Sequence, residues 1–429
     1  MKSSENKEIA LRFLWRAFRH RNYRLFFSGQ SASLIGTWMQ QIAASWLVYR
    51  LTDSAFMLGL VGFTGQIPTF IFSSFAGVYA DRWNRRRFII ATQTLAMIQA
   101  FVLAFLTLSG HVQVWHLLVL SGFLGLINAF DIPARQSFVV DLIEDRENLG
   151  NAIALNSFIF NGARLIGPSL AGLLIVLFGE GICFLINGIS FIGIVMALLA
   201  IQVADSPKAQ SKGRFWQDLL EGYAYAFGFT PIRAILLQLA LISFMGVPYS
   251  ILMPVFARDI LDGGSFTLGI LIASSGFGAL TGAAFLAARR TILGLGRLIA
   301  FSSGCFGIAV FIFALSRSVF LSLIMLYVVG FGMIVQMAAS NTVLQSIVDD
   351  EKRGRVMSLF AIAGMGMVPF GSLFAGAMAS RIGAPQTVMI CGAVCMIGAL
   401  IFAGYLPRIR EKIRPVYVQK GIINDLPSE

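Results

Sequence analysis

The sequence predicts an all-α polytopic membrane protein, with twelve transmembrane helices in two six-helix bundles and both termini in the cytoplasm. Three observations support this prediction. Hydrophobic residues make up 57% of the 429 residues and charged residues only 13%, whereas a soluble domain carries about 25% charged residues. Apolar segments of about 20 residues, the length of a membrane span, follow one another almost end to end. Basic residues gather in alternate connections between these segments.

The apolar segments fall into two sets of six. The first set comprises residues 25–49, 56–79, 88–109, 114–140, 151–178 and 181–202. The second set comprises residues 232–257, 267–288, 298–316, 319–346, 356–380 and 385–406. The connections are short, so neighbouring spans are expected to run antiparallel.

The distribution of charge predicts the orientation. The net charge is +12, with 33 lysines and arginines. If the N-terminus is cytoplasmic, only Arg50, Arg258, Arg317 and Arg381 face outwards, Arg164 lies within a span, and all other basic residues face the cytoplasm. Such asymmetry is typical of membrane proteins. It explains the basic character of the chain without nucleic acid as a partner.

The segment between the two sets predicts the domain organisation. It contains Asp205, Ser206 and Pro207, followed by an aromatic and basic stretch typical of an amphipathic helix on the cytoplasmic surface. The halves also resemble weak repeats, since Pro168 in span five parallels Pro369 in span eleven. We therefore expect a cytoplasmic segment 1–24, an N-terminal bundle 25–204, a linker 205–231, a C-terminal bundle 232–407 and a cytoplasmic tail 408–429.

Neither an enzyme site nor a metal site is evident. The four cysteines lie in apolar runs, and Cys391 and Cys395 have no histidine or carboxylate nearby. The histidines are isolated, and no nucleotide-binding glycine loop is present, which argues against direct use of ATP. No cofactor is predicted. The N-terminus lacks the apolar core of a cleavable signal peptide, so we expect the first span to direct insertion into the cytoplasmic (inner) membrane.

The strongest local pattern lies between spans two and three and reads Gly77-Val-Tyr-Ala-Asp81-Arg82-Trp-Asn84-Arg85-Arg86-Arg87. Gly77 permits close helix approach, Asp81 can pair with an arginine or cap a helix, and the arginines suit an anionic membrane surface. Ordinary positive-inside charge would explain the arginines but not the spacing of Gly77 and Asp81. The pattern therefore predicts an ionic latch that forms and breaks as two bundles rock.

This pattern resembles the loop motif of the major facilitator superfamily, Gly-x-x-x-Asp-Arg/Lys-x-Gly-Arg/Lys-Arg/Lys. The matching residues are Gly77, Asp81, Arg82, Arg85 and Arg86. Asn84 replaces the usual glycine. Asparagine is the other residue that tolerates the left-handed conformation, so we interpret this departure from the motif as mild. The resemblance covers the whole chain and implies the major facilitator fold.

A second resemblance lies in span five. Gly167-Pro168-Ser-Leu-Ala171-Gly172 is similar to the Gly-Pro-x-x-Gly-Gly element of exporters and antiporters in this superfamily, with Ala171 in place of one glycine. Helix packing alone would also favour a proline and small residues here. The match therefore supports export without deciding it.

Further segments resemble one branch of the superfamily, the drug and siderophore exporters that include the enterobactin exporter, also called transmembrane secretion effectors. They are Arg24 to Gln30, Leu51 to Ala55, Asp131 to Gln136, Asn151 to Asn156 and Ala163 to Pro168. The resemblance implies a monomeric secondary active transporter that exports a small amphipathic organic molecule by H⁺ antiport and alternating access. One departure is the stretch from His116 to Leu120, where many family antiporters carry an arginine.

Ionisable and polar residues inside spans four and five are candidates for coupling. Charges at membrane depth cost about 2.5–3.5 kcal/mol on insertion scales, so Arg164 is a functional candidate. Asn161 shares its helical face. Asn128, Asp131 and Arg135 share one face of span four. We expect Asp131 to pair with Arg164, an interaction that Arg135 could share. Either protonation of Asp131 loosens this pair and couples H⁺ to transport, or the pair is a permanent structural salt bridge.

A substrate cavity is predicted from polar, aromatic and methionine residues within three spans. Amide groups are costly against lipid, and methionine and aromatic groups suit a polyspecific ligand. Span one supplies Gln30, Ser33, Thr37, Trp38 and Gln41, span seven supplies Phe244, Tyr249 and Met253, and span ten supplies Gln336 and Ser340. Ordinary packing also accounts for the aromatic and methionine residues taken singly.

Two alternatives to the exporter stay open on the sequence. The same fold could serve an importer or a lysolipid flippase, against which only the span-five element and the branch resemblance speak. A membrane sensor or scaffold that transports nothing belongs to another class, and it would need an added soluble domain or a long tail.

Overall fold

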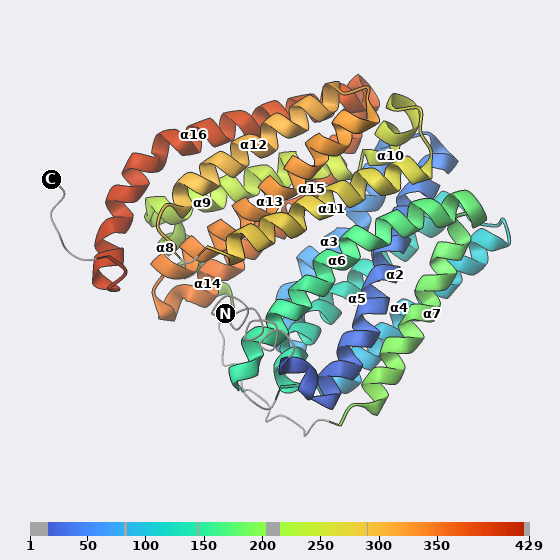
Figure 1. Ribbon diagram of the computed structural model, residues 1–429, viewed down its shortest axis with the longest axis horizontal. Helices are drawn as coiled ribbons and strands as arrows, with labels where there is room; N and C mark the ends of the chain where they lie inside the picture. Colours follow the sequence, from blue (N-terminus) through green and yellow to red (C-terminus); the bar gives the residue numbers. More distant parts are fainter. Residues whose placement is uncertain (1–15, 81–83, 144–145, 203–214, 290, 424–429) are drawn as a thin grey trace, which may run out of the picture. The chain divides into compact units, whose positions relative to one another are not determined.

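The computed structural model describes the backbone of residues 16–80, 84–143, 146–202, 215–289 and 291–423, and side chains within most of these ranges. The described chain is helical throughout (Figure 1). The first half contains η1 Arg16–Arg19, α2 Arg21–Thr52, α3 Ala55–Ala80, α4 Arg85–Leu108, α5 Val114–Asp141, α6 Arg146–Phe178 and α7 Glu180–Ala200.

The remaining helices follow in the order expected from the apolar segments. They are α8 Phe215–Gly228, α9 Thr230–Leu241, η2 Ile242–Gly246, η3 Val247–Ser250, α10 Met253–Val255, η4 Phe256–Ile260, α11 Ser265–Ala287, α12 Leu295–Leu315, α13 Val319–Ile347, α14 Asp350–Ala361, η5 Ile362–Gly366, α15 Val368–Ile382 and α16 Ala384–Gln419.

Within the described residues, eleven segments are long and apolar enough to cross a membrane. They correspond to the second to twelfth predicted spans. Helix α2, which contains the first, has 32 residues but does not reach the same hydropathy, because it carries several glutamines and serines. Gln30, Ser33 and Gln40 are almost fully buried inside the protein, so these three polar side chains of α2 are covered by neighbouring helices.

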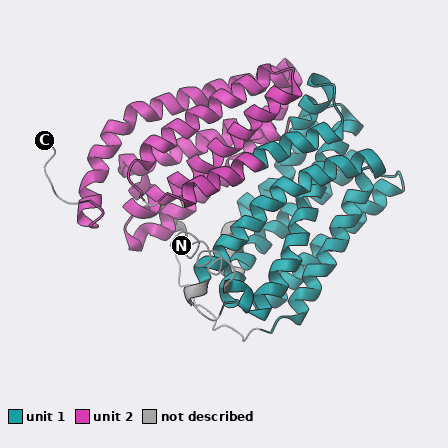
Figure 2. Cartoon of the chain, viewed as in Figure 1, with its two compact units in different colours: residues 1–211, 253–276 teal, residues 212–252, 277–429 magenta. Residues whose placement is uncertain are grey.

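The chain forms two compact units, coloured separately in Figure 2. Unit 1 comprises residues 1–211 and 253–276, and unit 2 comprises residues 212–252 and 277–429. The boundary therefore falls within the linker but also within span seven and helix α11.

Unit 1 is built around α2. This helix packs against α6 and α7, while α3 packs against α5, and α4 packs against both α5 and α7. Near the N-terminal end of α2, Tyr23 and Phe26 are buried, and Phe26 makes an edge-to-face contact with Phe138 of α5. These contacts join the start of α2 to α5 in the interior of the unit.

Two of the predicted spans are not continuous α-helices. The predicted span 232–257 is broken by the π-turns η2 and η4 and by the short η3, which begins at Val247-Pro248. The span 356–380 is broken by the π-turn η5, and α15 then starts at Val368-Pro369. Proline lacks the N–H that continues the helical ladder, and π-turns accommodate the missing bond.

The segment predicted as the linker contains helix α8, which packs against α14 in unit 2. Arg355 forms an ion pair with Glu221, and the Tyr225 hydroxyl donates to Asp349 Oδ2 at 3.2 Å. Burial, followed by the nearby Asp349 carboxylate, raises the pKa of Tyr225. The second part of the linker is therefore attached to the C-terminal half.

Candidate functional site

A buried carboxylate lies between α4 and α5 in unit 1. Asp131 is only 2% exposed. Its Oδ1 accepts hydrogen bonds from Thr92 Oγ1 at 2.7 Å and from Gln93 Nε2 at 2.9 Å. Both donors come from the first turns of α4, where α4 packs on α5. The site supplies the neutral donors that a buried carboxylate needs.

The cation at this site is Arg135, one turn further along α5. Its Nε lies 2.6 Å from Asp131 Oδ2, and its side chain is 21% exposed. The Nε has no aligned hydrogen-bond acceptor, so this close approach is an ion pair without a directed hydrogen bond. The structure therefore pairs Asp131 with Arg135 and not with the expected Arg164. Arg135 lies at i+4 on the same helix and is closer than an arginine on α6.

Pro133 lies between these two charged residues, inside α5. A proline cannot donate to the carbonyl four residues earlier, which here belongs to Ala129. Helix α5 therefore lacks one ladder hydrogen bond beside the ion pair. This places a local weak point in the segment that holds Asp131 and Arg135.

Arg164 of α6 lies over the ring of Trp38, with its Cζ 5.8 Å from the ring centroid. Trp38 also makes an edge-to-face contact with Phe160, at a centroid distance of 6.0 Å. Asn161 donates from Nδ2 to the Ser157 carbonyl oxygen on its own helix. Asn128 is half-buried on α5. The structure thus brings Arg164 to the predicted cavity helix, α2.

A network of buried amides crosses unit 1 and includes residues that we did not predict. Gln40 of α2 donates to Gln99 of α4 at 2.9 Å and accepts from Asn187 of α7 at 2.8 Å. Gln99 in turn donates to the Leu120 carbonyl oxygen on α5. The buried amide groups thus hydrogen-bond to one another and to a backbone carbonyl. These bonds link four helices, α2, α4, α5 and α7.

The predicted cavity residues of α2 do not share one environment. Gln30 and Ser33 are buried, and Gln30 Oε1 has no described hydrogen-bond partner. Thr37 is half-buried and donates to the Ser33 carbonyl oxygen, whereas Gln41 is exposed. The α2 residue that enters the amide network is Gln40, the neighbour of Gln41.

The other predicted cavity residues are mostly buried. Tyr249 is 4% exposed and contacts Phe306 edge-to-face, while the half-buried Phe244 contacts Phe374. Met253 is also buried. On α13, Gln336 and Ser340 are buried, and the Gln336 Nε2 donates weakly to the Ser340 hydroxyl at 3.4 Å.

The loop motif between α3 and α4 is described in part. Gly77 belongs to the backbone of α3, and Asp81 and Arg82 lie outside the described residues. Arg85 Nη1 lies 3.1 Å and 3.0 Å from the two carboxylate oxygens of Asp141 on α5. Arg86 donates to the Leu198 and Leu199 carbonyl oxygens near the end of α7. These contacts tie the start of α4 to two neighbouring helices.

Asn84 does not use the left-handed conformation that asparagine tolerates. Its φ is −63°, and it caps the N-terminus of α4 by accepting a hydrogen bond from the Arg87 backbone N–H at 3.0 Å. Asparagine is among the best N-cap residues because its side chain satisfies an orphan N–H of the first turn. The residue therefore starts a helix instead of replacing a glycine.

The span-five motif forms close helix crossings in unit 1. A Cβ on Gly167 would lie 2.6 Å from the Cβ of Trp38, and a Cβ on Gly172 would lie 2.8 Å from the Ser265 carbonyl oxygen. The Ser265 hydroxyl donates to the Gly172 carbonyl oxygen at 3.3 Å. Pro168 is contained within α6 without ending the helix. The motif residues thus pack α6 against α2 and α11.

A polar cluster lies at the C-terminal end of α2, which the charge distribution assigns to the outer face. The Tyr49 hydroxyl donates to Asp259, and Arg258 donates to Asp53. The Arg258 guanidinium also lies over the Tyr49 ring at 5.4 Å. These contacts join the end of α2 to η4. The sequence showed outer charges here, but it did not reveal which of them meet.

Within the described residues, no group of three or more His, Cys, Asp or Glu side chains could hold a metal ion. The same part of the chain holds the four cysteines, all free and three of them buried. The site therefore consists of a buried carboxylate with its arginine, an amide network and close helix crossings.

The model of one protein family, described as transmembrane secretion effector, matches residues 14–415. The chain belongs to this family. It is a major facilitator transporter and not an enzyme, and it acts on small molecules across a membrane. This agrees with the resemblance noted from the motifs.

Named relatives align over most of the chain. The staphyloferrin A transporter of Staphylococcus aureus is 26% identical over 88% of this chain and 95% of its own length. Macrolide efflux protein A of Streptococcus pyogenes is 23% identical over 89% and 96%. The multidrug efflux pump Tap of Mycolicibacterium fortuitum is 22% identical over 86% and 92%.

Solved structures share the fold. A bacterial homologue of the human lysosomal transporter Spinster, inward-facing and occupied, aligns with a TM-score of 0.70 and 15% identity, covering 92% of this chain and 98% of that one. A POT family transporter in complex with a thioalcohol-conjugated peptide aligns with a TM-score of 0.71 and 12% identity, covering 91% and 96%. At these identities the likeness concerns the fold alone.

Proposed function

We propose that the chain is a proton-coupled exporter of the cytoplasmic (inner) membrane. It moves a small amphipathic organic molecule, a drug or a siderophore-like metabolite, out of the cytoplasm by alternating access. Helix α2 provides the first of the twelve spans, and both termini face the cytoplasm. The named activities of the relatives in S. aureus, S. pyogenes and M. fortuitum support this class of cargo.

The observation that carries the proposal is the environment of Asp131. It is a carboxylate almost fully buried in a segment apolar enough to span the membrane. A charge at this depth is costly, so it is expected to serve a function and to have a compensating partner. Here the pair with Arg135 has no aligned hydrogen bond, and Arg135 retains partial exposure. Such a pair is easier to open than a bidentate one.

Proton uptake at Asp131 would change the balance of forces within α5. A neutral carboxyl group keeps its hydrogen bonds with Thr92 and Gln93 but loses the attraction to Arg135. Arg135 is then released towards solvent, and the missing ladder bond at Pro133 lets this part of α5 adjust. In this account, proton binding at Asp131 and the helix rearrangement are coupled.

We further propose that the contacts of Tyr49, Asp53, Arg258 and Asp259 form an outer gate. They join α2 to η4 at the end assigned to the outer face, where α6 and α11 are also closely packed at Gly172. Outward release of cargo requires these contacts to break. The loop motif with Gly77, Asp81, Arg82, Arg85 and Arg86 is the proposed counterpart at the cytoplasmic face.

The proposed cargo site is lined by polar and aromatic residues predicted from the sequence. In unit 1 these include Gln30, whose buried Oε1 lacks a described partner, and Trp38 beneath Arg164. An aromatic ring and a guanidinium together suit a planar or anionic group on a ligand. Siderophore-like carboxylates or catecholates and aromatic drugs offer such groups.

The proposal is tested by transport in proteoliposomes with an imposed pH gradient. Labelled macrolide, a carboxylate siderophore and a catecholate siderophore are supplied one at a time to vesicles whose interior is acidic. We expect at least one to accumulate in exchange for protons by chains inserted with their cytoplasmic face outwards, and a protonophore to stop it. Accumulation that needs the opposite gradient would establish an importer, and the absence of flux under either gradient would favour the sensor.

The lysolipid flippase is separated by a second assay in the same vesicles. Fluorescent lysophospholipid placed in one leaflet is followed by quenching from the outside. We expect no acceleration of its movement over protein-free vesicles. Acceleration without movement of any siderophore or macrolide would replace the exporter by the flippase.

A further inference from the structure

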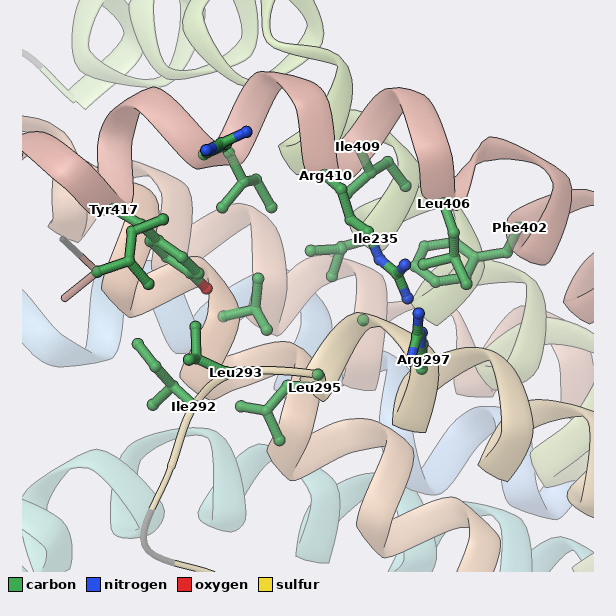
Figure 3. Close-up of a pocket in the computed structure, with 16 residues that line it drawn as sticks. Ile235, Ile292, Leu293, Leu295, Arg297, Phe402, Leu406, Ile409, Arg410 and Tyr417 are labelled. Carbon is green, nitrogen blue, oxygen red and sulfur yellow. The ribbon is translucent and has the colours of Figure 1, made fainter. Parts of the chain in front are cut away.

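Unit 2 contains a pocket that none of the proposed transport residues lines (Figure 3). Its volume is about 290 Å³. It lies where the N-terminus of α12 meets the C-terminal part of α16, and Ile235 of α9 also lines it. The pocket is at the lower limit of size for small-molecule sites, about 300–1,000 Å³. It has room for a polar head group with a few adjoining carbons.

The wall of the pocket is apolar. On α16, Phe402, Leu406, Ile409 and Ile413 recur at helical spacing and turn the same face to it. Leu295 of α12 faces them and is almost fully buried. Contact between water and such a wall is unfavourable, whereas burial of a hydrocarbon chain against it lowers the free energy. The lining therefore favours an occupant with an apolar part.

The mouth of the pocket is basic. Arg297 of α12 and Arg410 of α16 both line it, and Figure 3 shows their guanidinium groups directed towards one another. None of the lining residues is an aspartate or a glutamate. Within the described part of the chain, no ion pair or hydrogen bond joins either side chain to a carboxylate. Two guanidinium groups that converge in this way favour an anion between them, and arginine is suited to phosphate.

The turn before α12 is organised independently of these two arginines. Arg289 donates to the Thr291 and Leu293 carbonyl oxygens, and Gly294 takes a φ of 80°. Helix α12 then begins at Leu295 without a side-chain cap. Its first backbone N–H groups, including those of Gly296 and Arg297, are unsatisfied within the helix and carry a partial positive charge. They add to the attraction for an anion at this end.

The pocket lies at a membrane surface. The segment Leu295–Leu315 is apolar enough to span, so its first residues mark one end of a span. The same end of α16 carries basic residues well beyond the last apolar turn. The charge distribution assigns this side to the cytoplasm, where the leaflet contains anionic lipids. A basic mouth over an apolar wall at this level matches the amphipathic form of a phospholipid.

We propose that this pocket binds an anionic phospholipid of the cytoplasmic leaflet. The phosphate lies between Arg297 and Arg410, and the first carbons of the acyl chains lie against α16. A free phosphate would use the arginines but leave the apolar wall without a partner. Because α16 and α12 pack together along their length in unit 2, a lipid held here joins the ends of both helices. The site is independent of the proposed transport function.

The test uses the full-length chain in detergent, titrated with fluorescently labelled phosphatidylglycerol. Arg297→Gln and Arg410→Gln are the test variants, and Arg408→Gln is the matched control. Arg408 lies on the same helix and carries the same charge, but it lies over Tyr405 and does not line the pocket. Removing one basic residue near a membrane surface weakens the binding of anionic lipid by about five-fold through charge alone, even where no specific site exists. This is the loss expected for the control. We expect at least about ten-fold weaker binding for each test variant, more than for the control.

Arg297→Lys separates geometry from charge. It keeps the charge but loses the planar pair of donors, so we expect binding between that of the native chain and Arg297→Gln. Thermal unfolding without lipid checks that each variant is folded. An equal loss in Arg297→Gln, Arg410→Gln and Arg408→Gln would overturn the proposal in favour of diffuse surface attraction.

Competition identifies the part of the lipid that is recognised. Unlabelled short-chain phosphatidylglycerol, glycerol phosphate, inorganic phosphate and phosphatidylcholine are compared as competitors. We expect short-chain phosphatidylglycerol to displace the probe at a concentration at least about ten-fold lower than any other competitor requires. Equal displacement by inorganic phosphate would show a simple anion site, and equal displacement by phosphatidylcholine would show an apolar groove. Either result contradicts the proposal and leaves the exporter untouched.

Discussion

Arg135 Nε lies 2.6 Å from Asp131 Oδ2, and the two residues are one turn apart on α5. The carboxylate is buried and also held by Thr92 and Gln93, whereas the arginine is partly exposed. One partner is therefore held firmly by its surroundings, and the other can leave. This asymmetry is the basis of the proposed coupling.

Replacing Arg135 alone should destabilise the protein more than replacing both partners. Arg135→Gln leaves Asp131 buried without its cation, which in a fully buried pair costs about 3–5 kcal/mol. The cost here is expected at the lower end, since Arg135 is partly exposed. Asp131→Asn combined with Arg135→Gln removes both charges and should recover most of the loss in melting temperature at neutral pH. A double variant no more stable than Arg135→Gln would rule out this charge pairing.

Gly172 and Gly162 provide a matched pair on α6. A Cβ at Gly172 would meet the Ser265 carbonyl oxygen at 2.8 Å, whereas a Cβ at Gly162 meets nothing within 4 Å. Gly172→Ala should therefore lower the melting temperature through overpacking, which costs about 1–3 kcal/mol. Gly162→Ala should raise the melting temperature slightly, because alanine in place of a helical glycine increases the free energy of unfolding by about 0.5–1 kcal/mol. Equal shifts in both variants would contradict the α6–α11 crossing.

Breaking the proposed outer gate should expose Ser265, which is 4% exposed. Ser265→Cys is introduced into a chain whose four native cysteines have been replaced. Arg258→Gln removes the contact with Asp53 and should increase the rate of labelling by a membrane-impermeant thiol reagent several-fold. Arg317→Gln, expected on the same face but outside the cluster, is the control. Unchanged labelling in Arg258→Gln would mean that the cluster does not close this end.

Asn84 distinguishes an N-cap from a left-handed turn. Its side chain accepts from the Arg87 N–H, and its φ is negative. Asn84→Ala should reduce stability by about 1 kcal/mol, and Asn84→Gly by only a few tenths. Chemical denaturation of the purified chain in mild detergent would measure both. A more stable Asn84→Gly variant would instead indicate a left-handed conformation at this position.

The order of the helices was predictable because each apolar run is long and most connections are short. The breaks within the seventh and eleventh spans were not, because π-turns such as Ile242–Gly246 leave no gap in hydropathy. Pro248 and Pro369 lie next to these breaks and explain them locally. Their positions relative to the helix ends are known only from the structure. The low hydropathy of α2 is explained by burial inside the protein, which depends on its neighbours.

The candidate site was predictable in its residue types more than in its contacts. The shared face of Asp131 and Arg135 followed from helical periodicity, yet we expected Arg164 as the main partner. A helical stripe from Ser33 and Thr37 reaches Gln40 as well as Gln41, since the period is 3.6 residues. Burial against Asn187 and Gln99 selects Gln40. Periodicity alone cannot make that choice.

We propose that Asp131 carries the proton that drives export. The most direct measurement compares Asp131→Asn with the native chain in proteoliposomes, using a cargo found in the panel above. We predict that the variant still exchanges labelled for unlabelled cargo across the membrane but no longer accumulates cargo under a pH gradient. Gradient-driven accumulation at the native rate by a folded Asp131→Asn variant would contradict the claim.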